Sequence, residues 1–129
     1  MTVIGDLYQI LKDFNAAVRD EQLQQALVEK ANKQAFRSFY YDWITFRDAG
    51  LRADYPSFVR DIADSYANVM LQILSGMGPQ LSPHQKNQLQ SFITELRKIS
   101  ATIEISELNV IDQKMNQAAE KAKMIFEGS

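Results

Sequence analysis

Hydrophobic residues recur along this chain at steps of three and four positions, in stretches separated by polar residues, glycine or proline. This spacing places the hydrophobic side chains of a stretch on one face of an α-helix. No stretch alternates hydrophobic and polar residues as a half-buried strand does, and no Asn-Gly or Asp-Gly pair marks a hairpin. The pattern predicts an all-α fold, an antiparallel bundle of four to five amphipathic helices, with one or two of them long.

The first half of the chain leaves the number of helices open. Between Asp6 and Ala49 there is no glycine or proline, so residues 3–49 could form one helix or two. We favour a break near residues 15–20, with Asp20 as the N-cap of the second helix, because an aspartate side chain accepts hydrogen bonds from free backbone N–H groups. A single helix over residues 21–49 would be about 40 Å long. The next predicted helix, residues 56–77, is shorter and would leave part of it uncovered.

The second half contains clearer signals for helix starts. Pro56 suits the first turn of a helix. Ser82 and Gln85 have the spacing of a capping box, in which each side chain binds the other residue's backbone N–H. The hydrophobic pattern shifts between residues 101 and 110, so the run over residues 83–127 either continues through this region or breaks there with Ser106 as a new N-cap.

Residues 36–46 hold six aromatic side chains in eleven positions, including the one tryptophan of the chain. On a helix, five of the six fall within about 120° of arc, the width of a buried face: Phe36, Phe39, Tyr40, Trp43 and Phe46. Tyr41 points away from this face, Ile44 lies at its border, and Arg37 lies off it. Either the segment is simply the main core element, or Tyr41, Ile44 and Arg37 extend a surface for a partner.

The length and composition of the chain indicate one globular domain, and its net charge bears on the kind of partner it binds. The 129 residues fit one domain, residues 1–129, that is large enough to bury a core. Hydrophobic residues make up 46% and charged residues 23% of the chain, as in ordinary globular proteins. The net charge is −2, whereas nucleic-acid binding relies on a surplus of basic residues that neutralise phosphates. We therefore expect no nucleic-acid partner.

Residues that could carry chemistry are sparse. The chain has no cysteine, and its one histidine, His84, falls at the second position of a predicted helix with no nucleophile placed beside it. No Glu-x-x-His motif or phosphate-binding glycine loop occurs. Two carboxylate pairs, Asp61 with Asp64 and Glu104 with Glu107, fit a solvated helix face, with cation binding as the alternative. We expect no enzyme activity, no cofactor and no metal.

The N-terminal residues lack the pattern of a secretory signal, since no basic segment precedes a continuous hydrophobic one. The longest hydrophobic stretch, residues 59–77, is interrupted by charged and amide side chains, so we expect no membrane span. These features predict a cytoplasmic protein.

Together the patterns predict a non-enzymatic protein–protein interaction module, such as an adaptor, a chaperone-like protein or a structural accessory subunit, that also self-associates. Its partner-binding residues would be Tyr41, Ile44 and Arg37. The alternative is a carrier of a small ligand or cofactor, bound in a pocket between helices. Its aromatic walls would come from residues 39–43 and from Tyr66.

Overall fold

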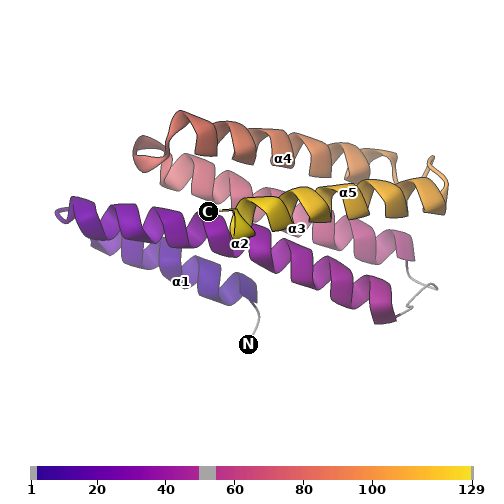
Figure 1. Ribbon diagram of the computed structural model, residues 1–129, viewed down its shortest axis with the longest axis horizontal. Coiled ribbons are helices and arrows are strands. Elements are labelled where there is room, and N and C mark those ends of the chain that lie inside the picture. Colours follow the sequence, from indigo (N-terminus) through magenta and orange to yellow (C-terminus); the bar gives the residue numbers. More distant parts are fainter. Residues whose placement is uncertain (1–2, 50–54, 129) are drawn as a thin grey trace.

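The computed structural model describes residues 3–49 and 55–128, with the backbone alone for residues 3–6. Helices account for nearly all of this part, and it contains no strand, which confirms the all-α prediction. The elements are α1 (Val3–Ala16), α2 (Glu21–Ala49), α3 (Tyr55–Gly76), the 3₁₀ helix η1 (Gly78–Gln80), α4 (Pro83–Thr102) and α5 (Leu108–Glu127). Consecutive helices run in opposite directions and lie roughly side by side, so the fold is an antiparallel bundle (Figure 1).

The break in the first half of the chain lies where the sequence predicts it. Helix α1 ends at Ala16 and α2 begins at Glu21. The Asp20 side chain accepts a hydrogen bond from the backbone N–H of Leu23 at 3.0 Å, as an N-cap does. From there α2 runs unbroken to Ala49, which makes it the longest helix of the described chain.

The predicted start of α4 is also confirmed. Ser82 Oγ accepts from the Gln85 backbone N–H at 3.1 Å, and the Gln85 side chain accepts from the Ser82 N–H at 3.0 Å. The helix then breaks before α5, but the expected N-cap is wrong by one residue, because Glu107 occupies that position. The reason is that the Ser106 N–H still bonds to Thr102 O and so belongs to the turn that closes α4.

The aromatic face of α2 forms the centre of the core. Phe36, Phe39 and Trp43 are fully buried. The ring of Phe92 on α4 packs edge-to-face against Phe36 and Phe39, with centroids 5.0 and 5.2 Å apart. Edge-to-face pairs of this kind place the positive ring edge against the negative ring face. Tyr40, expected on the buried face, is only half-buried and packs against the core from its edge.

Polar contacts fix how α3 and α5 sit against α2. The Trp43 indole N–H donates to Asn116 Oδ1 on α5 at 2.8 Å, and Arg47 donates to the same oxygen at 3.0 Å. The Tyr66 hydroxyl on α3 donates to Asp42 on α2. Burial, followed by this hydrogen bond and by the Asp42 charge, raises the pKa of the Tyr66 phenol well above its usual value. Directional bonds inside a core select one register between helices.

Across the described ranges, none of the helices combines the length and the hydrophobicity that crossing a bilayer requires.

Candidate partner-binding surface

The three residues predicted to bind a partner lie on one face of α2. Arg37, Tyr41 and Ile44 are separated by four and three positions, so they follow one another along the helix. Arg37 is exposed and Tyr41 is 51% exposed, whereas Ile44 is half-buried and packs against the core. The structure therefore brings the three together, with Ile44 at the margin of the surface.

Tyr41 is exposed but not isolated. Its ring packs against Tyr40, with centroids 5.2 Å apart, and against Phe126 at the end of α5, with centroids 6.2 Å apart. The Arg37 guanidinium lies over its ring, 5.7 Å from the centroid, a distance at which a cation is attracted to the ring face. These three neighbours pack against the tyrosine ring, about half of whose surface still meets solvent.

Two lysines extend this surface toward the start of α2. Lys30, Lys33, Arg37, Tyr41 and Ile44 fall within about 80° of arc on the helix, and together we call them the α2 stripe. Four of them, with Gln34 and Phe126, line a shallow hollow of about 260 Å³. Within the described chain, none of the three cations forms an ion pair. The stripe is thus locally positive on a chain whose net charge is −2.

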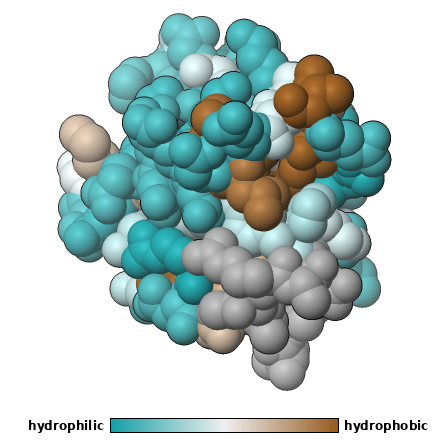
Figure 2. Space-filling view, turned by 90° about the vertical axis from the view of Figure 1, so that its right-hand side faces the viewer, coloured by the Kyte–Doolittle hydropathy of each residue, from teal (hydrophilic) through white to brown (hydrophobic). Residues whose placement is uncertain are grey.

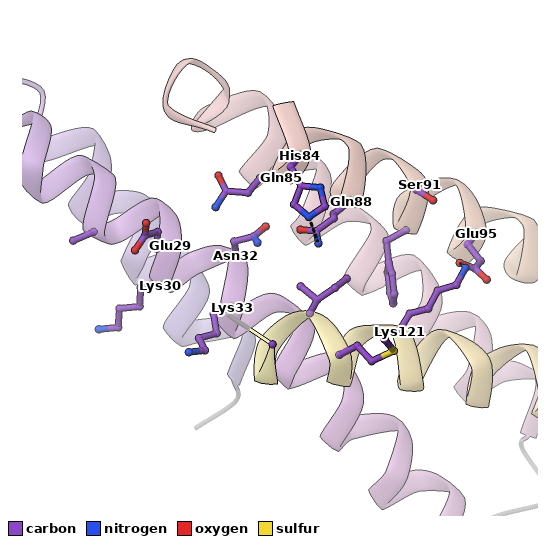
Figure 3. A pocket seen from close by; sticks show the side chains of 15 residues that line it. Glu29, Lys30, Asn32, Lys33, His84, Gln85, Gln88, Ser91, Glu95 and Lys121 are labelled. Carbon is purple, nitrogen blue, oxygen red and sulfur yellow. Dashed lines mark hydrogen bonds and ion pairs between the residues drawn. The ribbon is translucent and has the colours of Figure 1, made fainter. Parts of the chain in front are cut away.

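A larger groove lies between α2 and α4, next to the α2 stripe (Figure 3). It has a volume of about 1080 Å³, and its remaining wall is the last two turns of α5. Helix α2 has 29 residues and α5 has 20. In Figure 1, α5 lies between α4 and α2 over one half of the bundle, in front of α3, and ends near the middle of the bundle. The groove occupies the place that a longer α5 would fill.

Asn32 is the unusual residue of this groove. Its side chain is only 7% exposed, and its Oδ1 is buried without a hydrogen bond from any described residue. Figure 3 shows the amide directed from α2 into the space beside His84 and Gln85 of α4. A buried acceptor left without a donor destabilises a fold by about 1–3 kcal/mol. The wall of the groove therefore contains a polar acceptor that the described part of the protein leaves without a hydrogen bond.

Some of the charged residues around the groove form an ion pair with each other, and others do not. Lys121 and Glu95 form an ion pair at 3.1 Å, so they neutralise each other. Lys30 and Lys33 line the α2 side, where Glu29 is the one remaining acidic residue of the lining. On the α4 side, His84 Nε2 shares a hydrogen bond with the Gln88 amide at 3.1 Å. The α2 edge of the groove is therefore weakly positive.

A second exposed region lies at the other end of the bundle. The α4–α5 connection and the first turn of α5 carry Ile105, which is 85% exposed, together with Leu108 and Val110. Figure 2 looks at this end and shows hydrophobic side chains gathered on the surface. Hydrophobic groups clustered in this way on a surface mark an interaction site more often than scattered ones do.

The pocket expected between the core aromatics is filled by side chains. Phe39, Trp43 and Tyr66 are at most 1% exposed, and the rings of Phe39 and Tyr66 pack against each other with centroids 5.6 Å apart. None of the three lines the hollows described above. Among residues 7–49 and 55–128, no three His, Asp or Glu side chains cluster as metal ligands would. Glu104 instead pairs with Arg60 at 3.0 Å.

No family model, curated protein or solved structure matches this chain. The functional argument therefore rests on the geometry of its own surface.

Several residues of these surfaces were not predicted from the sequence. Phe126 reads as an ordinary core position of α5, and only the packing of α5 on α2 places it beside Tyr41. Nothing in the sequence distinguishes Asn32, because it lies among other polar residues of a helix. Lys30 and Lys33 were not predicted either, although they precede Arg37 by seven and four positions, a spacing that indicates a shared helix face.

Proposed function

We propose that this protein is a non-enzymatic helical interaction module that binds a protein partner through the α2 stripe. The observation that supports this most directly is the environment of Tyr41, a half-exposed aromatic ring held by Tyr40, Phe126 and Arg37. A ring that is already ordered loses little conformational entropy on binding and offers both hydrophobic area and a hydroxyl. Residues with this profile are enriched at binding hot spots.

The charge of the stripe indicates the kind of partner. Lys30, Lys33 and Arg37 have no ion-pair partner among the described residues, so a partner segment with carboxylates beside a hydrophobic residue would complement them. The carrier alternative has less support, because the aromatic walls it requires are packed against other core side chains.

Comparison of two tyrosine variants tests the proposal. Affinity purification from the native cell with mass spectrometry would identify the partner, and a binding titration would compare Tyr41→Ala with Tyr8→Ala. Tyr8 lies on α1 and is 45% exposed, so it is a matched control. We expect Tyr41→Ala to weaken binding by about 1–3 kcal/mol and Tyr8→Ala to leave it unchanged. Equal effects of the two variants, or no effect of either, would remove the α2 stripe from the interface.

Self-association is a second candidate function, and a different observation favours it. The exposed side chains of Ile105, Leu108 and Val110 are uncharged and lie at one end of the bundle. A second copy of the chain could cover them in a two-fold symmetric contact, in which the same patch meets itself. The α2 stripe is less suited to such a contact, because its cations would face one another.

A further inference from the structure

From the groove between α2 and α4 we infer a second contact with the partner: a hydrophobic-faced helical segment with carboxylates along one edge, bound beyond the end of α5. The inference rests on the proposed function only in assuming that the occupant is protein. It concerns residues outside the α2 stripe, apart from Lys30 and Lys33 on the shared edge.

The shape of the groove indicates a helix. Helix α5 already occupies the same furrow, where it buries a face that includes Met115, Ala118 and Ala122. Beyond its end the walls continue as the first half of α2 and the first turns of α4 (Figure 3). A volume of about 1080 Å³ is slightly larger than that of ordinary small-ligand pockets, and the site is an open furrow instead of an enclosed cavity. Helix-in-groove binding uses furrows of this kind.

The floor and the edges of the groove indicate the chemistry of that helix. Met124, Ile125 and Ala26 provide hydrophobic surface, with the buried Phe92 behind them, which suits a hydrophobic helix face. Lys121 and Glu95 neutralise each other, which leaves two lysines, Lys30 and Lys33, against one glutamate, Glu29, on the α2 edge of the groove. Carboxylates on the near edge of the occupant would pair with these lysines.

Asn32 provides the independent sign that something binds here. Its Oδ1 is buried in the wall without a donor from the described chain, and its amide points into the groove. Rotation of the Asn32 side chain on binding would let a polar side chain of the occupant, or a free backbone N–H in its first turn, supply the missing hydrogen bond. An asparagine kept only for stability would instead be bonded within the bundle.

A defined peptide tests the inference on the full chain. The probe is a 14-residue helical peptide with leucines at i, i+3, i+4 and i+7 and glutamates along one edge; the control peptide has lysines in place of the glutamates. In an NMR titration of the isotope-labelled protein, we expect the glutamate peptide to saturate below about 1 mM. The signals of residues 26–33 and 84–92 and of the Asn32 amide side chain should shift. Added salt should weaken binding.

Tyr41→Ala distinguishes binding in the groove from binding at the α2 stripe, because Lys30 and Lys33 belong to both surfaces. Lys30→Glu combined with Lys33→Glu should weaken the glutamate peptide about fivefold or more, whereas Tyr41→Ala should leave its affinity unchanged. Asn32→Leu should weaken peptide binding and also raise the melting temperature, because it removes an unsatisfied buried group. A melting temperature that falls, with peptide affinity unchanged, would make Asn32 a structural residue and overturn its role.

Three other results would overturn the proposed contact: no saturation by the glutamate peptide, equal affinity for the lysine peptide, or shifts confined to residues 37–44. The last of these would leave the proposed function standing, because it would place the peptide on the α2 stripe alone. The opposite result is also possible: the peptide binds in the groove, but Tyr41→Ala does not change the affinity for the native partner. The function proposed for the α2 stripe would then be wrong, and the contact proposed for the groove would stand.

Discussion

Two aromatic residues on α2, two positions apart, have opposite environments. Trp43 is fully buried and its indole N–H bonds to Asn116, whereas Tyr41 is half-exposed at the edge of α5. The difference follows from the helical period, which turns neighbouring side chains by 100° per residue. Trp43 therefore supports the fold, whereas Tyr41 presents about half of its surface to solvent.

This contrast predicts unequal effects on stability. Trp43→Ala should lower the free energy of unfolding by about 3–5 kcal/mol, because it leaves a cavity in a close-packed core. Tyr41→Ala should change it by no more than about 1 kcal/mol. Urea denaturation followed by circular dichroism measures both values. If the two variants lose similar stability, Tyr41 belongs to the core and is not available as a binding residue.

Tyr66 leads to a prediction at alkaline pH. Its phenol has a raised pKa in the folded protein because it is buried and bonded to Asp42, whereas in the unfolded chain the pKa is about 10. The unfolded state therefore loses this proton first, and the associated stability is complete below pH 10 and falls as the pH rises above it. The slope from this one group is up to about 1.4 kcal/mol per pH unit.

Tyr66→Phe isolates this contribution. The variant should be less stable than the parent protein near neutral pH, since Asp42 loses its hydrogen-bond donor, but its stability should fall less steeply between about pH 10 and 12. Chemical denaturation at several pH values gives the two slopes. Tyr8→Phe, an exposed tyrosine, is the control. If stability falls equally steeply with pH in the Tyr66 variant and in the parent protein, the loss of stability above pH 10 does not come from Tyr66.

At the scale of the elements, the sequence predicts the helices well because their signals are local. Asp20 and the Ser82–Gln85 pair act on N–H groups within three residues, so their role can be recognised without knowing the fold. The start of α5 lacks such a signal. Its N-cap, Glu107, makes no side-chain capping bond, and the last turn of α4 sets the position of the break.

The capping of α2 can be measured. Asp20→Ala should destabilise the protein by about 1 kcal/mol, because the Leu23 N–H loses its acceptor. Asp20→Asn should retain most of the stability, since an asparagine side chain caps about as well as aspartate. Thermal melts of the two variants provide the comparison. A loss of stability that is the same for both would show that the negative charge matters and the hydrogen bond does not.

At the scale of the whole molecule, the surfaces depend on contacts that no local pattern contains. The sequence places Arg37, Tyr41 and Ile44 on one helix face, and the structure agrees. Phe126 reaches Tyr41 from a position 85 residues further along the chain, and Asn32 becomes notable only because no described residue donates to it. Packing between distant segments decides both facts. The candidate site is therefore only partly predictable from sequence.

The exposed end of the bundle gives a prediction about assembly. If a second copy covers Ile105, Leu108 and Val110, the protein should sediment as a dimer at micromolar concentration, and Ile105→Asp should shift it to the monomer by placing a charge in the contact. Leu71→Asp, at an exposed leucine on α3, is the matched control and should leave the dimer intact. A parent protein that is monomeric at these concentrations would rule out self-association through this end.

The bond between Trp43 and Asn116 has a practical consequence. Because the chain has a single tryptophan, and because that indole bonds directly to α5, its fluorescence reports on one junction of the molecule. Separation of α5 from α2 would expose the indole to water and shift its emission to longer wavelength while the helix content stays the same. Separation of α5 from α2 can thus be followed through the protein's own tryptophan, with no label attached.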